Sequence, residues 1–152
     1  AARGGDHEQI RLVGEGCHFV DLLRFLVAAP IESFQVARMD GATPDTANVM
    51  LRFADGSLGT ILYLANGSKA FPKERLEVFA AGRVLQLDNF RRLVGFGWPG
   101  FSKMNLWQQN KGHAACAAAF VNALKSGGAA PIPLVELIEV SRISIRIEEA
   151  LR

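Results

Sequence analysis

The chain has 152 residues, enough for one ordinary domain with a single hydrophobic core. Its 17 basic and 15 acidic side chains give a net charge of +2 and no basic cluster, which argues against a nucleic-acid-binding protein. Hydrophobic residues make up 49% of the chain, but no apolar run is long enough to span a bilayer. We therefore expect the apolar surplus to cover a core and an interface with another domain or subunit.

The two cysteines, Cys17 and Cys116, form no C-x-x-C motif. One pair in a chain of this length indicates neither a disulfide framework nor a metal site. These features predict a cytoplasmic protein without a bound metal.

The first predicted helix covers residues 17–28. It follows a small acidic turn, Gly14-Glu15-Gly16, which its glycines make mobile. The helix ends before Pro30, because a residue that precedes proline is pushed out of the helical region. Its apolar positions follow helical spacing: Phe19, Leu22, Leu23 and Leu26.

The middle of the chain predicts an antiparallel meander. Apolar and polar residues alternate over 46–54, the pattern of a strand buried on one face. Asp55-Gly56 is a strong signal for a hairpin turn into the next strand, residues 58–64. Further strands are expected at residues 31–39, 75–80, 84–87 and 91–96.

Residues 97–109 are predicted as a loop, and two helices close the chain. The first begins near residues 110–113 and ends before Gly127. The second covers 134–151, with one apolar side and one solvated side where charges pair. The apolar side holds Val140, Ile143, Ile147 and Leu151, and the solvated side holds Glu139, Arg142, Arg146 and Glu149.

These elements predict one α+β domain spanning residues 1–152. An open, mainly antiparallel sheet would carry the closing helix pair on one face. The other face of the sheet would be bare.

The start of the first helix is a candidate proton-transfer site. His18 and Asp21 lie one turn apart, and Glu15 precedes His18 by three residues. In the first turn the helix dipole disfavours a positive imidazole, so His18 could accept a proton from a hydroxyl. The alternative is that His18 caps or packs and that Asp21 is a solvated helix residue.

Residues 95–100 read Gly-Phe-Gly-Trp-Pro-Gly and match G-x-G-x-x-G. We reject a dinucleotide site there, because no amphipathic helix follows and no acidic ribose ligand lies at the required distance.

Two basic segments are candidate substrate contacts. Lys111-Gly112-His113 lies at a helix start and could hold an anionic or hydroxylated group. Lys73 belongs to a basic junction between a loop and a strand, which could touch a carboxylate, a phosphate or a partner. The alternative for both segments is solvated surface.

Four stretches resemble the C-terminal domain of the Gfo/Idh/MocA family, the glucose–fructose oxidoreductase and inositol 2-dehydrogenase group. The resemblance covers residues 11–152. It is carried by residues 14–23 (GEGCHFVDLL), 51–57 (LRFADGS), 72–79 (PKERLEVF) and 111–113 (KGH).

The resemblance implies a substrate-binding and oligomerising domain of an NAD(P)-dependent oxidoreductase acting on a hydroxyl of a sugar, sugar nucleotide or cyclitol. NAD or NADP would be bound by a Rossmann domain absent from this chain, so this fragment alone is expected to bind no cofactor and to be inactive. The family histidine maps onto His18. The family often has an aspartate four residues before it, where this chain has Gly14, and Glu15 is a possible substitute.

The resemblance also implies three partners: the chain's own Rossmann domain, a sugar-like small molecule, and further copies that meet through the sheet face. The alternative function is a non-catalytic sugar-binding or oligomerisation module.

Overall fold

A computed structural model describes residues 12–40 and 46–152. The chain divides into two compact units. The first contains the described residues up to Asn66 together with Ile132–Arg152, and the second contains Gly67–Pro131. Each unit has its own antiparallel sheet. The fold class expected from the sequence, an open antiparallel sheet with helices, is confirmed.

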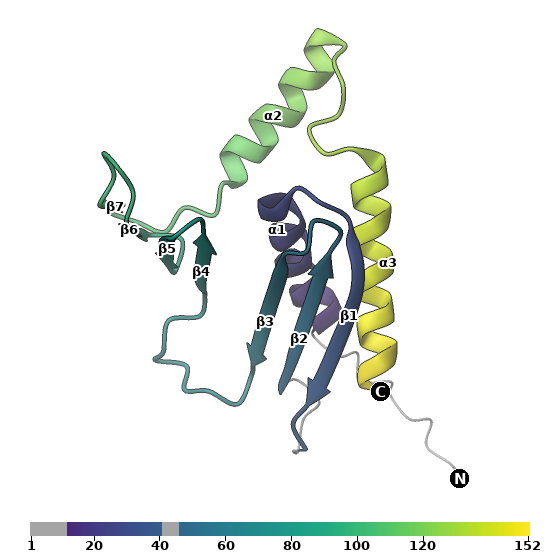
Figure 1. Cartoon of the computed structure of the whole chain (residues 1–152). Helices are drawn as coiled ribbons and strands as arrows, with labels where there is room; N and C mark the ends of the chain where they lie inside the picture. Colours follow the sequence, from purple (N-terminus) through teal and green to yellow (C-terminus); the bar gives the residue numbers. More distant parts are fainter. Residues whose placement is uncertain (1–11, 41–45) are drawn as a thin grey trace. The chain divides into compact units, whose positions relative to one another are not determined.

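The first unit is built on a three-stranded sheet with the order β1-β2-β3 (Figure 1). Asp55-Gly56 forms the expected hairpin turn between β2 and β3, and Gly56 has a φ of +86°, which favours glycine. The backbone N–H and the hydroxyl of Ser57 both donate hydrogen bonds to the Asp55 carboxylate. These bonds, the backbone one first, lower the pKa of the Asp55 carboxyl. The strands are β1 (Ile31–Arg38), β2 (Thr46–Phe53) and β3 (Leu58–Leu64).

Helices α1 (Cys17–Val27) and α3 (Leu134–Leu151) lie on the same side of this sheet (Figure 1). The predicted apolar side of α3 is buried and is confirmed. The predicted apolar side of α1 is only partly correct, because Leu26 is 42% exposed whereas Val20 is buried. Together the helices and strands enclose one core: Val20, Ile31, Ala47, Val49, Leu51, Phe53, Ile61, Val140, Ile143, Ile147 and Leu151.

A buried ion pair ties α1 to α3. Arg24 is only 7% exposed, and its Nε lies 3.1 Å from Glu139 Oε2. The other oxygen of Glu139 accepts the backbone N–H of Ile31 at 2.5 Å. The prediction that Glu139 lies on the solvated side of its helix is therefore wrong. The spacing of residues within one helix cannot reveal the partner of Glu139, because Arg24 lies 115 residues earlier in another helix.

The strand β1 is also fastened to α3 along its length. Arg38 donates from Nη1 to the carbonyl of Leu151 at 2.7 Å, which satisfies one of the free carbonyls at the end of the helix. The guanidinium of Arg146 lies 5.3 Å from the ring centre of Phe34. Together with the Glu139 contact, these interactions hold both ends and the middle of β1 against the helix.

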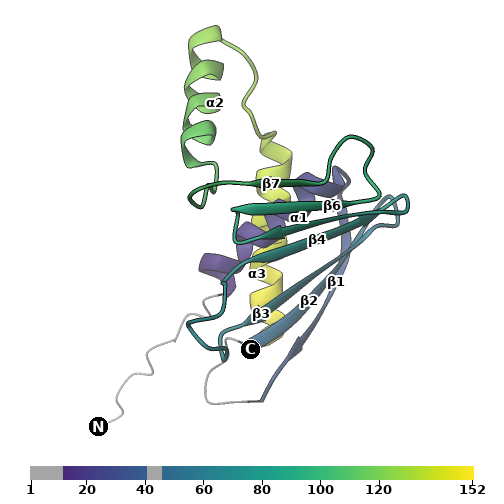
Figure 2. The same ribbon diagram turned by 90° about the vertical axis from the view of Figure 1, so that its left-hand side faces the viewer.

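The second unit carries a four-stranded antiparallel sheet with the order β4-β5-β6-β7, seen in Figure 2 as adjacent strands. The predicted loop 97–109 is partly wrong, because residues 103–105 form a short edge strand against β6. Three residues are too few for periodicity to reveal. The elements are β4 (Arg75–Ala80), β5 (Arg83–Asp88), β6 (Arg92–Phe96), β7 (Lys103–Asn105) and α2 (His113–Ser126).

The predicted single meander is also corrected, because the strands form two separate hydrogen-bonded sheets. Residues 65–74 connect them without strand structure, in a stretch that contains Gly67 and Pro72. The predicted closing helix pair is divided as well, since α2 belongs to the second unit and α3 to the first. The two helices on the face of the first sheet are α1 and α3. Within the described residues no helix is both long and apolar enough to cross a membrane.

We expect Arg24→Met to lower the free energy of unfolding by about 2–4 kcal/mol, because it leaves the half-buried Glu139 without its cation. Urea unfolding followed by circular dichroism measures the change. Arg52→Met is the matched control, because Arg52 and Glu32 are paired at 3.7 Å but both are more than half exposed. That change should cost less than about 1 kcal/mol. Equal effects of the two substitutions would contradict a structural role for the buried pair.

Candidate functional site

The segment before α1 is a helical turn. Residues Leu12–Gly16 form a π-helical turn, η1, that continues directly into α1. The predicted mobile acidic turn is therefore wrong. Because helical backbone begins at Leu12, His18 is also not at the free start of the helical segment, and the expected effect of the helix dipole on it is reduced. Single π-turns of this kind are common at functional sites.

Glu15 has a partner that the sequence did not predict. The hydroxyl of Tyr63, on β3, donates to Glu15 Oε2 at 2.9 Å. Tyr63 is half-buried and packs against the core, whereas Glu15 is exposed. The only sequence signal was that Tyr63 falls on the inward-facing positions of β3, where an aromatic ring with a polar tip needs a partner.

His18 is exposed, which excludes the alternative in which it packs in the core. The helix has no side-chain hydrogen bond at its N-cap, so His18 does not cap it either. Asp21, one turn later, is half-buried. Thus the Tyr63 phenol and the Glu15 carboxylate are hydrogen-bonded at η1, and the exposed imidazole of His18 follows three residues later in the first turn of α1. Such a set can accept hydrogen bonds from a polyhydroxylated ligand and can move a proton.

Lys111 is exposed, and it is also held by partners within the second unit. Its ammonium group pairs with Glu74 Oε1 and lies 5.9 Å from the ring centre of Phe90. Gln109 also donates to Glu74, at 3.2 Å, and to Asn89 at 2.9 Å. These contacts join the start of β4 to the turn after β5 and to the segment before α2. The charge of Lys111 is thus compensated within the second unit.

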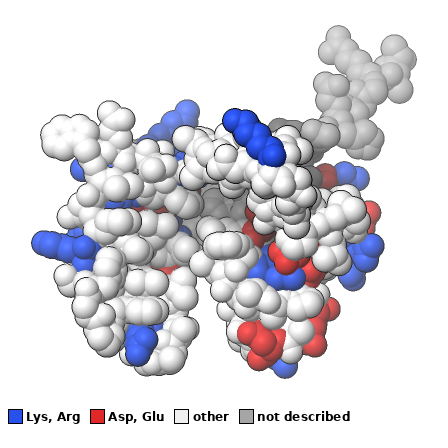
Figure 3. All heavy atoms as spheres, turned by 90° about the horizontal axis from the view of Figure 1, so that it is seen from above, with Lys and Arg blue, Asp and Glu red and all other residues white. Residues whose placement is uncertain are grey.

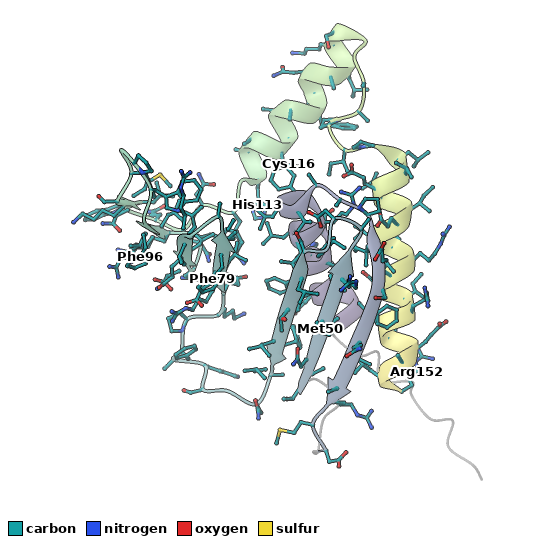
Figure 4. All side chains as sticks on the ribbon, viewed as in Figure 1. Met50, Phe79, Phe96, His113, Cys116 and Arg152 are labelled. Atoms are coloured by element: carbon teal, nitrogen blue, oxygen red, sulfur yellow. The ribbon has the colours of Figure 1, made fainter. Side chains whose placement is uncertain are left out.

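His113 and Lys73 are both exposed. His113 is the first residue of α2, after Gly112 with a φ of +79°, and it lies one turn from Cys116 (Figure 4). Lys73 directly precedes Glu74. The predicted residues therefore fall into two groups: Glu15 and His18 in the first unit, and Lys73, Lys111 and His113 in the second.

The glycine-rich stretch 95–100 is the end of β6 and the turn that follows it. A side chain at Gly95 would meet Phe101, because an added Cβ would lie 2.7 Å from its Cδ1. Trp98 closes the same region, donating from its indole N–H to the carbonyl of Val84 at 3.0 Å. No helix starts after this turn in the second unit before α2. The stretch therefore lacks the helix N-terminus that a dinucleotide fingerprint requires.

The described residues contain no group of three or more His, Cys, Asp or Glu side chains that could hold a metal ion. Cys17 and Cys116 are free thiols. On the face drawn in Figure 3, Lys and Arg side chains are separated from one another by uncharged surface and by acidic residues.

Comparison with solved structures identifies the fold. The chain is similar over its full length to the UDP-N-acetylglucosamine 3-dehydrogenase GnnA from Acidithiobacillus ferrooxidans, with a TM-score of 0.74 and 16% identity. It is similar over 92% of its length to the dehydrogenase MviM from Clostridium difficile, with a TM-score of 0.71 and 16% identity. The chain has the fold of these dehydrogenases. They are of the Gfo/Idh/MocA type that the sequence resembles.

A further neighbour is the WlbA dehydrogenase from Bordetella pertussis, whose structure is a complex with NADH and UDP-GlcNAcA. Its TM-score is 0.57 and its identity 20%, over 93% of this chain. The chain spans 52% of GnnA, 48% of MviM and 42% of WlbA, about half of each. No protein-family model and no curated protein matches the sequence.

We expect Gly95→Ala to destabilise the second unit by about 1–3 kcal/mol, because the added methyl group would overlap Phe101 and Trp98. Both tryptophans of the chain, Trp98 and Trp107, lie in this unit, so tryptophan fluorescence during urea unfolding reports on it. Gly14→Ala is the control, because nothing lies within 4 Å of an added Cβ there. A Gly95→Ala chain as stable as the Gly14→Ala chain would show that the close packing is not required.

Proposed function

We propose that this chain is the substrate-binding C-terminal domain of an NAD(P)-dependent oxidoreductase that acts on a hydroxyl of a sugar, sugar nucleotide or cyclitol. The observation that carries the proposal is the Glu15–His18–Tyr63 arrangement at the start of α1, in a fold shared with about half of several sugar-nucleotide and related dehydrogenases. Carboxylate and imidazole groups are the acceptors that bind and deprotonate a hydroxyl.

His18 takes the proton of the reacting hydroxyl, and Glu15 accepts a hydrogen bond from a hydroxyl of the same ring. Exposure of both side chains leaves them accessible to a ligand. Oxidation of the ring carbon also requires an acceptor for its hydride, and nicotinamide supplies that chemistry. The glycine-rich stretch 95–100 offers no dinucleotide cradle, since Phe101 fills the space above Gly95. In the proposed enzyme, NAD or NADP is held by a separate Rossmann domain.

We also propose Lys73 and His113 of the second unit as substrate contacts, because both are exposed and polar. Lys111 would join them by giving up its pairing with Glu74. A nucleoside diphosphate carries the negative charge that such cationic groups recognise.

In the dehydrogenase that contains this chain, we expect His18→Ala to lower turnover by about 10²–10⁴-fold, because it removes the proton acceptor. The measurement is NAD(P)H formation with UDP-N-acetylglucosamine as the test substrate. Cys116→Ala, an exposed change in α2, should leave turnover unchanged. Unchanged turnover in the His18 variant would refute the assigned role. The 152 residues alone should neither bind NADH tightly nor catalyse the reaction. Tight NADH binding by this chain would refute the proposal that a separate domain holds the cofactor.

We further propose that copies of the chain associate through the outer face of the first sheet. On β3, Leu58, Leu62 and Leu64 are 62%, 64% and 58% exposed and alternate with the buried positions of the strand. An edge strand with exposed leucines is a surface that proteins ordinarily cover.

Leu62→Asp should therefore shift the chain toward monomer in sedimentation velocity at micromolar concentration, because a charge would be buried in the interface. Phe25→Asp is the control. Phe25 is 75% exposed on α1, outside that face. A monomeric wild-type chain, or equal effects of both changes, would contradict association through this sheet.

A further inference from the structure

We propose that Tyr63 is the positioning residue of the Glu15–His18 site. Its hydroxyl fixes the Glu15 carboxylate beside His18 and leaves one carboxylate oxygen for the ligand. This inference rests on the function proposed above, and it adds a residue from β3 to a site otherwise drawn from the η1–α1 segment.

The tyrosine ring is itself held in place. Tyr63 is paired with Ala47 in the β2–β3 ladder and packs against the hydrophobic core. Because side chains on a strand alternate between faces, a slip of one residue in this ladder would carry Tyr63 to the opposite face. The buried Gly59 and Ile61 on the same face fix that register. The phenol oxygen is therefore presented from a rigid support.

The Tyr63 phenol reaches Glu15 because of the way in which α1 packs on β3. At Gly59 the strand and the helix approach closely, since an added Cβ would lie 2.8 Å from Leu23 Cδ1. From Leu23 back to Glu15 a helix rises about 12 Å. From Gly59 forward to Tyr63 a strand extends about 13 Å. The two lengths match, so the Leu23–Gly59 contact at one end brings Glu15 and Tyr63 together at the other.

Glu15 needs such a partner because it is exposed and its side chain has three rotatable bonds. Without a fixed donor it would exchange among rotamers, and a ligand would bear the entropy of ordering it. Tyr63 donates to Oε2. Within residues 12–40 and 46–152, no hydrogen bond to Oε1 is formed, so that oxygen stays open. His18 follows Glu15 by three residues in the continuous helical segment η1–α1, and both side chains are exposed.

The first test measures affinity of the 152-residue chain for UDP-N-acetylglucosamine by calorimetry. We expect Tyr63→Phe to raise Kd about three- to tenfold, as loss of one hydrogen bond would. Glu15→Gln should raise Kd at least as much. Adding Tyr63→Phe to Glu15→Gln should cause no further loss, because the proposed effect of the phenol on ligand affinity passes through the carboxylate. Ser141→Ala, an exposed change on α3, is the control and should leave Kd unchanged.

A merely structural tyrosine would behave differently. Its removal would lower the thermal midpoint of unfolding, and it would weaken binding by the same factor in the wild type and in the Glu15→Gln variant. Additive effects of the two substitutions on Kd would therefore overturn the proposal. So would a Tyr63→Phe chain that binds as tightly as the wild type.

The second test needs no ligand. Tyr63 is the only tyrosine in the chain, so the ¹³Cζ signal of a tyrosine-labelled sample belongs to it alone. Glu15→Gln should shift that signal. Tyr63→Phe should change the side-chain scalar couplings of Glu15 to the averaged values of a side chain that exchanges among rotamers. Cys116→Ala should change neither. A tyrosine signal unmoved by Glu15→Gln overturns the positioning role. If the wild type binds no probe while both signals respond, the substrate assignment fails and the positioning role stands.

Discussion

Arg24 connects three elements of the first unit through one guanidinium group. It leaves α1 and meets Glu139 on α3, and the same carboxylate receives the N–H of Ile31 at the start of β1. A second carboxylate, Glu136, lies 3.5 Å from the guanidinium. A buried cation without partners would be costly, so the three elements can occupy these positions only together. The angle at which α1 crosses the sheet, and with it the place of His18, depends on this arrangement.

The candidate site lies at the opposite end of α1 from this ion pair. The C-terminal half of this helix is thus fixed by two adjacent residues, Arg24 through its ion pair and Leu23 through its close packing on Gly59. Its N-terminal end extends through η1 and is held by the Tyr63 hydroxyl. A helix held at three points is a more precise support for reacting groups than a loop. The acidic turn that the sequence suggested would not have provided that precision.

The sequence allowed most of the fold to be predicted, because its strongest signals are local. Alternation located β2 and β3, the Asp55-Gly56 pair located their turn, and helical spacing located α1 and α3. Two failures are local, the acidic turn that is helical and the loop that contains β7, and the others concern contacts between distant residues. Glu139 was placed on the solvated side because its partner lies in another helix, and the partnership of Tyr63 with Glu15 spans 48 residues. His18 and Glu15 were predicted as site residues mainly through a family resemblance, and periodicity alone could not distinguish them from ordinary surface.

The stretch 95–100 shows why a motif must be judged by the space around it. A dinucleotide fingerprint needs glycine so that a pyrophosphate can approach the backbone and a helix N-terminus can face it. Here the space above Gly95 is occupied by Phe101, and Gly97 and Gly100 adopt φ values of +72° and +74° that serve a tight turn. The same letters therefore satisfy a packing constraint that excludes the ligand. Recognition of a nicotinamide dinucleotide requires a backbone cradle of a different shape from the one that residues 95–100 form.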